Sequence, residues 1–142
     1  MASEVEDQKA ELFIVSRDGK ERQVTDLKSV FPGMNITIGD FNWSPDGRFI
    51  SLWLNVRKGE YYGEWRFAIL SVETDQLVDY CFPSDPSDYP YSIWSPNSQQ
   101  VAFPSYEGDT FYVYDLFVLD VEKKEAKKIP GVGRLWGWMV SP

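Results

Sequence analysis

An internal repeat constrains this chain more than any other feature of its sequence. The segment Trp43-Ser44-Pro45-Asp46-Gly47 is followed by a close match, Trp94-Ser95-Pro96-Asn97-Ser98, and a weaker copy ends at Val140-Ser141-Pro142. The Ser-Pro pairs end at positions 45, 96 and 142, so the intervals are 51 and 46 residues. A regular interval of this size is typical of repeat architectures, in which neighbouring units bury one continuous core.

A second set of matching segments supports the repeat. Short apolar runs of four residues begin at Leu12, Phe67 and Leu116, which gives intervals of 55 and 49 residues. Two unrelated markers therefore share a period of about 50 residues, close to the length of one β-propeller blade.

Each repeat is predicted to contain four short strands and almost no helix, because no window shows helical periodicity. The Ser-Pro-Asp-Gly segment predicts a turn between the first two strands, since Pro presets φ, Asp hydrogen-bonds its own backbone and Gly tolerates positive φ. The expected strands lie at residues 11–16 and 21–25, at 41–44, 48–55, 64–72 and 76–80, at 91–95, 99–105, 112–121 and 125–129, and at 135–140.

The repeat resembles the TolB-like, WD-repeat-like β-propeller family, whose blades carry a W-S-P-D-G turn between their first two strands. The resemblance covers residues 11–142, and it implies an all-β fold of four-stranded antiparallel blades. Residues 1–10 are expected to be a flexible segment. The rest is expected to form half a blade (11–40), two blades (41–90 and 91–134) and the first strand of another blade (135–142).

Such a count cannot close a propeller, which typically has four to eight blades. Three explanations stay open. The chain is a fragment of a larger propeller, or two copies assemble into one ring, or another chain completes an open array.

Composition argues against several classes of partner. The chain has 14 Lys and Arg against 22 Asp and Glu, a net charge of −8, which disfavours nucleic acid and anionic membrane surfaces. The N-terminus resembles no secretory signal, so we expect a cytoplasmic protein if the chain is complete, and a periplasmic or extracellular one if it is cut from an exported parent.

Catalysis by this chain alone is not expected, and neither is a cofactor or a metal. The sequence has no histidine, no G-x-S-x-G segment and no P-loop. Carboxylates such as Asp40, Glu64, Glu107 and Asp115 leave a glycosidase fragment as a weak alternative. The acidic segments around residues 85–88 and 107–109 lack a calcium-loop pattern and are expected to be solvated. The single cysteine, Cys81, is expected to have no basic group nearby and therefore to be a passive thiol.

Aromatic residues near strand ends are the best functional lead, because Tyr and Trp supply large rigid contact areas at interfaces. We therefore expect a non-catalytic scaffold that binds a protein or peptide through loops on one face. The alternative is the gating portion of a prolyl-oligopeptidase-type hydrolase whose catalytic residues lie elsewhere. Trp43, Trp53, Trp65 and Trp94 are expected to pack between blades. The candidate binding residues are Tyr61, Tyr62, Tyr89, Tyr91, Tyr106 and Trp136.

Overall fold

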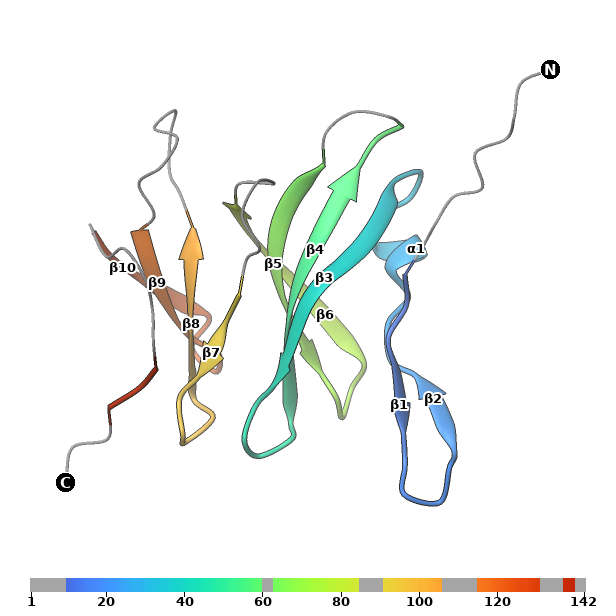
Figure 1. Cartoon of the computed structure of the whole chain (residues 1–142), viewed down its shortest axis with the longest axis horizontal. Coiled ribbons are helices and arrows are strands. Elements are labelled where there is room, and N and C mark those ends of the chain that lie inside the picture. Colours follow the sequence, from blue (N-terminus) through green and yellow to red (C-terminus); the bar gives the residue numbers. More distant parts are fainter. Residues whose placement is uncertain (1–9, 60–62, 85–90, 106–114, 131–136, 140–142) are drawn as a thin grey trace.

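The computed structural model describes residues 10–59, 63–84, 91–105, 115–130 and 137–139. Over these segments the chain forms antiparallel sheets of two, four and four strands and one helical turn. The sheets follow one another in chain order across the molecule (Figure 1). The expectation of an all-β chain with four-stranded antiparallel sheets is confirmed.

The central sheet has the strand order β3-β4-β5-β6. Its inner strands read as apolar runs because both of their faces are covered, and Leu52, Trp53 and Leu54 are all fully buried. Tight turns join β3 to β4 and β5 to β6, so neighbouring strands pair antiparallel. The strands are β3 (Asn35–Trp43), β4 (Phe49–Arg57), β5 (Glu64–Ser71) and β6 (Gln76–Ser84).

The C-terminal sheet repeats this order as β7-β8-β9-β10. Its first strand is short, because β7 pairs with β8 at only two positions. Its last strand is exposed along its whole length. The strands are β7 (Ile93–Trp94), β8 (Gln100–Ser105), β9 (Asp115–Asp120) and β10 (Glu125–Ile129).

An N-terminal hairpin of β1 (Phe13–Val15) and β2 (Glu21–Gln23) precedes the helical turn α1 (Leu27–Val30). Asp26 caps α1, since its carboxylate accepts a hydrogen bond from the Ser29 backbone N–H. Leu27 is wholly buried against the central sheet. One helical turn agrees with the expectation of almost no helix.

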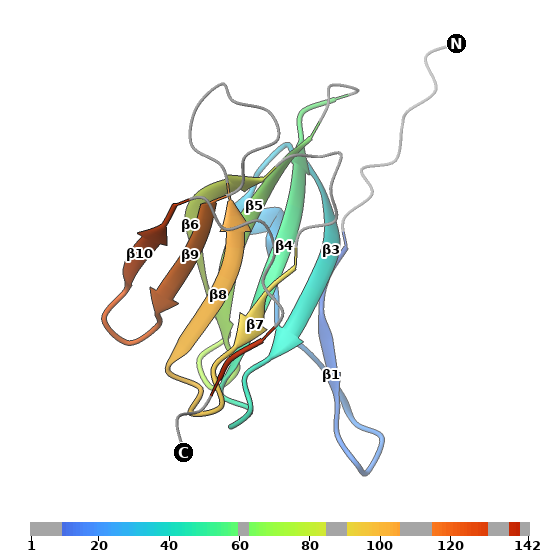
Figure 2. The same cartoon turned by 60° about the vertical axis from the view of Figure 1, so that its left-hand side comes forward.

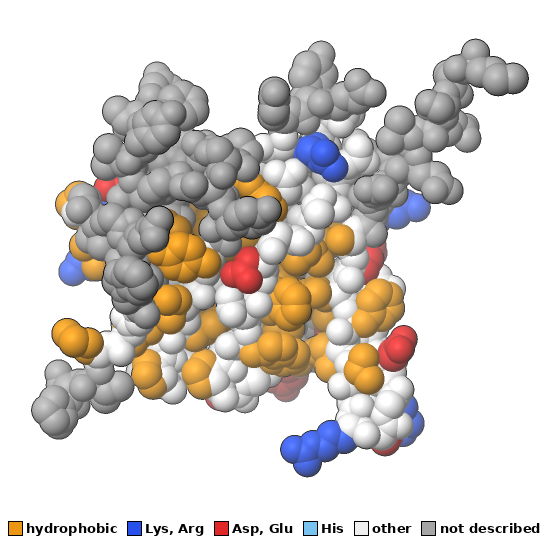
Figure 3. Space-filling view, viewed as in Figure 1, with side chains coloured by type: hydrophobic (Ala, Val, Ile, Leu, Met, Phe, Trp, Pro, Cys, Tyr) orange, Lys and Arg blue, Asp and Glu red, His pale blue; other side chains and the backbone are white. Residues whose placement is uncertain are grey.

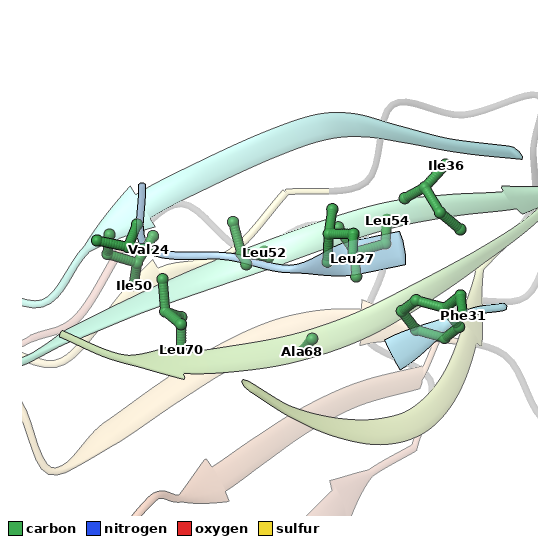
Figure 4. Close-up of a cluster of buried hydrophobic side chains, with 9 residues drawn as sticks. All are labelled: Val24, Leu27, Phe31, Ile36, Ile50, Leu52, Leu54, Ala68 and Leu70. Atoms are coloured by element: carbon green, nitrogen blue, oxygen red, sulfur yellow. The ribbon is translucent and has the colours of Figure 1, made fainter. Parts of the chain in front are cut away.

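Two hydrophobic clusters hold the three sheets together. The first lies between the N-terminal hairpin with α1 and one face of the central sheet, and is mostly aliphatic (Figure 4). The second lies between the other face of the central sheet and the C-terminal sheet (Figure 2), and is rich in aromatic rings. The central sheet is thus covered on both faces.

The first strand of the central sheet begins at Asn35, six residues before the expected start at Phe41. Gly39 lies at a register shift between Ile38 and Asp40, and the Trp65 ring packs over it so closely that a Cβ there would lie 2.2 Å from Trp65 Cη2. A β-bulge with close side-chain approach is a common role for glycine within a strand. Gly39 interrupts the apolar pattern of the sequence, and the first half of β3 was therefore not predicted.

Two other strand predictions differ from the structure. β6 was expected to end at Tyr80 but runs to Ser84, because a second register shift and a positive φ at Cys81 carry it past Pro83. Proline is tolerated there since β6 is an edge strand. The strand expected over residues 135–140 is not seen in its described part, residues 137–139.

Candidate functional site

The two Trp-Ser-Pro turns have equivalent hydrogen bonds. In the first, Phe49 N donates to Ser44 Oγ over 2.9 Å, and Ser44 Oγ donates to Asp46 Oδ1 over 2.7 Å. In the second, Gln100 N donates to Ser95 Oγ over 2.9 Å, and Ser95 Oγ donates to Asn97 Oδ1 over 2.7 Å. Ser44 and Ser95 are buried in both turns. The predicted repeat is therefore a structural repeat, and these residues shape the turns.

Each turn also has a residue with a positive φ at the same position. Gly47 has a φ of 73°, and Ser98 reaches 61° at the matching place. Serine pays a steric cost in this region, and its hydroxyl has a role that glycine could not fill: Ser98 Oγ accepts a hydrogen bond from Asp46 N over 3.0 Å. The two turns thus contact each other directly.

The two tryptophans of the repeat differ in their surroundings. Trp94 is 8% exposed and packs between the sheets, as expected, whereas Trp43 is 44% exposed. The expectation that Trp43 packs between blades is therefore wrong. Its face of β3 lies beside the N-terminal hairpin, and that two-stranded hairpin is too narrow to reach across all four strands of the central sheet.

A polar seam joins β3 and β4 of the central sheet to β7 and the two residues just before it. Trp94 Nε1 lies 3.0 Å from both the Asn42 carbonyl oxygen and Ser51 Oγ, and Ser51 Oγ lies 2.8 Å from Ser92 Oγ. Trp53 Nε1 donates to the Tyr91 carbonyl over 3.2 Å. This seam was not predicted from the sequence. Its signal was Ser51, a serine in the middle of an otherwise apolar strand.

Every segment that carries the candidate loop tyrosines leaves the sheets at one end. β4 ends and β5 begins there, at Arg57 and Glu64, and the same holds for Ser105 and Asp115 in the C-terminal sheet. β6 also ends there, and β7 begins there. We call this the loop end (top in Figure 1), and the opposite end, with the tight turns, the turn end.

The candidate binding residues are only partly described. Tyr61, Tyr62, Tyr89, Tyr106 and Trp136 lie outside the described residues. Tyr91 is half-buried just before β7, and its carbonyl accepts the Trp53 hydrogen bond. The structure thus ties Tyr91 to the seam between the sheets.

In the described part of the chain, three buried polar atoms at the loop end have no hydrogen-bond partner. They are Asn35 Oδ1 at the start of β3, Arg57 Nε at the end of β4 and Trp65 Nε1 near the start of β5. An unsatisfied buried polar group typically costs about 1–3 kcal/mol. Buried polar groups without partners are rare in folded proteins. Their presence where the tyrosine-bearing segments leave the sheets makes the loop end a candidate binding surface.

The candidate carboxylates do not form a pair in the described part of the chain. Asp40 lies in β3 and Glu64 in β5, with β4 between them. Asp115 belongs to the other large sheet, where it forms an ion pair of 2.7 Å with Lys128. Burial raises the pKa of Asp40, although hydrogen bonds, including one of 2.9 Å from Asn42 Nδ2, oppose the shift. Glu107 lies outside the described residues.

Cys81 has a basic neighbour that the sequence did not reveal. Arg66 Nη2 lies 2.9 Å from Cys81 Sγ and also 2.9 Å from Asp79 Oδ2. The bulge in β6 turns Cys81 toward β5 and brings the two residues together. The expectation of a thiol with no basic group nearby is therefore wrong, while its passive character stays a prediction.

A shallow hollow of about 300 Å³ lies between the N-terminal hairpin and the turn before β6, and is lined by Gln23, Val24, Thr25, Asp26 and Asp75. Its two carboxylates are already engaged, because Asp26 caps α1 and Asp75 forms an ion pair with Arg22. Within the described ranges, no cluster of His, Cys, Asp and Glu suits a metal ion. No helix in those ranges is long and apolar enough to cross a membrane.

Comparison with known proteins adds no assignment. No protein-family model matches the chain, and no curated protein matches it in sequence.

Proposed function

We propose that this chain is a non-catalytic scaffold of the β-propeller type, similar to the TolB-like repeats, which binds a protein or peptide through its loop end. The observation that carries the proposal is the common exit of the tyrosine-bearing segments. The described strand ends on either side of residues 60–62, 85–90 and 106–114 all lie at the same end of the two large sheets. Tyrosines in those segments would contribute to one surface.

The chemistry of the loop end suits a polypeptide ligand. Among the described residues, the buried donors Arg57 Nε and Trp65 Nε1 and the buried acceptor Asn35 Oδ1 have no hydrogen-bond partner, and they lie beside the exits of the tyrosine-bearing segments. A peptide offers main-chain carbonyl oxygens and N–H groups to a polar and aromatic surface of this kind. Aromatic side chains add contact area at little entropic cost.

A peptide-display selection on the immobilised chain tests this proposal. We expect enriched peptides whose affinity for a variant with Tyr61, Tyr62 and Tyr89 all changed to Ser falls at least about tenfold. Thr74→Ala is the matched control, because Thr74 is exposed in the turn between β5 and β6, at the turn end. Selected peptides that bind the triple variant as tightly as the parent chain would contradict the proposal.

A further inference from the structure

Trp43 and Trp94 hold the same position in equivalent turns, yet only Trp94 is covered. The Trp94 ring stacks on Phe49 with centroids 6.2 Å apart, and its indole N–H reaches the Asn42 carbonyl and Ser51 Oγ. No described residue accepts a hydrogen bond from the Trp43 indole, which is 44% exposed beside Phe41 at 49%. Figure 3 shows hydrophobic side chains at the surface over β3 and β1.

The same comparison identifies a strand with a free edge. The apolar runs that begin at Leu12, Phe67 and Leu116 place β1, β5 and β9 at equivalent positions of the repeat. β5 pairs with β4 and β6, and β9 pairs with β8 and β10. Among the described residues β1 pairs only with β2. Within the described residues, the edge that β4 occupies in the central sheet is therefore open along Phe13–Val15, while Ala10, before β1, donates to the Ile36 carbonyl of β3 over 3.2 Å.

A single β-hairpin could both cover the Trp43 indole and pair with the open edge of β1. In the complete pair of sheets, the β3–β4 hairpin supplies the acceptors for Trp94 from Asn42 and Ser51, and the same hairpin pairs with β5 through β4. We propose that a two-stranded β-hairpin of a partner polypeptide docks on one surface of this chain. This docking surface consists of Trp43, Phe41 and the open edge of β1. This surface is separate from the loop end, so the inference does not depend on the proposed function.

The β3–β4 hairpin also indicates the chemistry of the partner. Its first strand would offer a main-chain carbonyl to Trp43 Nε1, as Asn42 does to Trp94. Its second strand would carry an aromatic residue and a small hydroxyl residue, in the places of Phe49 and Ser51. Strand addition of this kind gains affinity from main-chain hydrogen bonds and specificity from side-chain pockets.

The described residues of a second copy offer no free hairpin of this kind. Its β3–β4 and β7–β8 hairpins are already inside four-stranded sheets, paired with β5 and β9. A hairpin from a different polypeptide therefore fits this docking surface better than a second copy does.

The test uses the chain's own hairpin as the probe. Residues 35–57 are fused ahead of Met1 of the full chain through a flexible linker with a protease site, and the linker is cut after purification. We expect the freed hairpin to stay bound during size-exclusion chromatography and to slow amide hydrogen exchange in β1. Trp43→Phe in the full-length part should weaken retention about tenfold, since it removes one hydrogen bond.

Two controls make the outcome decisive. Ile129→Ala alters an exposed apolar residue on β10, in the far sheet, and should leave retention unchanged. A probe of the same composition with shuffled strand residues should elute separately. The inference is overturned if the native probe separates after cleavage, or if it is retained equally by the Trp43→Phe chain and in its shuffled form.

Discussion

The two faces of the central sheet are covered in different ways. On one face, four strands of the C-terminal sheet bury an aromatic cluster in which the Phe67 and Phe103 rings stack with centroids 3.8 Å apart. On the other, two short strands and one helical turn bury an aliphatic cluster around Leu27 and Leu52. The first face ends in the polar seam of Trp94, while the second leaves Trp43 at the surface.

The difference shows what a complete neighbouring sheet contributes. Apolar burial is achieved on both faces, because even the narrow N-terminal hairpin leaves Leu52 and Leu70 fully buried. Buried polar links arise where β3 and β4 lie beside β7 and the residues just before it, as Asn42, Ser92 and Trp94 show, whereas the N-terminal hairpin reaches the central sheet through the exposed Arg22–Asp75 pair and a hydrogen bond from Arg22 to the Val72 carbonyl. Burial of apolar area is non-directional, whereas the seam fixes the register of one sheet against the next.

The largest effect is expected at the centre of the aromatic face. Phe103 is fully buried and contacts Trp53, Phe67, Phe82 and Phe117. Phe103→Ala should lower the free energy of unfolding by about 3–5 kcal/mol, measured by urea denaturation, because the cavity cannot collapse among four rigid rings. A loss below about 1 kcal/mol would contradict the packing of the two sheets.

A smaller and sharper effect separates the two tryptophans. Trp94→Phe removes the indole N–H from the seam and leaves the buried Ser51 hydroxyl with one partner fewer, so the free energy of unfolding should fall by about 1–3 kcal/mol. Trp43→Phe is the matched control and should stay within about 0.5 kcal/mol of the parent chain, since Trp43 is half exposed. Equal losses would mean that the two positions have similar surroundings.

Most elements of the two large sheets could be predicted from the sequence. The repeat predicted both large sheets, their turns and most strand limits to within two residues, because a Ser-Pro-Asp-Gly turn acts through local backbone preferences that survive in any tertiary context. Gln76 and Glu125, which begin the last strands of the two sheets, were both placed correctly. The bulge at Gly39 was not predicted, since it depends on Trp65 from a strand that lies two places away in the sheet.

The candidate site was harder to predict than the fold. Trp43 and Trp94 look alike in sequence, and only the width of the neighbouring sheet decides which indole is covered. The contact of Arg66 with Cys81 depends on a second bulge, in β6. Both features are set by long-range packing, which a residue pattern does not encode.

The two Trp-Ser-Pro turns should also differ in how their contribution to stability depends on pH. Burial alone would raise the pKa of Asp46, but hydrogen bonds from Ser44 and Arg48 outweigh it and lower the pKa to about 2. A lowered pKa stabilises the fold above the ordinary value of 3.8, and this contribution is lost as pH falls toward about 2. Asp46→Asn, which copies Asn97 of the second turn, should remove that part of the acid dependence.

Urea midpoints measured at several values between pH 2 and pH 5 would check this. At neutral pH the substitution should cost at most about 1 kcal/mol, because the Asp46–Arg48 pair is exposed to solvent. Asn97 offers the reciprocal variant, since Asn97→Asp should add acid dependence in the same pH range. An unchanged acid profile in both variants would show that the turns do not titrate as their hydrogen bonds imply.

The smallest effect is expected at Asp40, and it has the opposite sign. Burial raises the pKa of Asp40 above 3.8, so its contribution to stability is present in full below that pH and is lost as the carboxyl ionises at higher pH. Asp40→Asn keeps an oxygen to accept from Asn42 Nδ2 and should raise the free energy of unfolding at pH 7 by about 0.5 kcal/mol, with almost no change at pH 3. Urea denaturation at the two pH values measures the difference. A variant less stable than the parent chain at pH 7 would mean that the charged carboxylate supports the seam, and the polar link between the sheets would then be electrostatic as well as hydrogen-bonded.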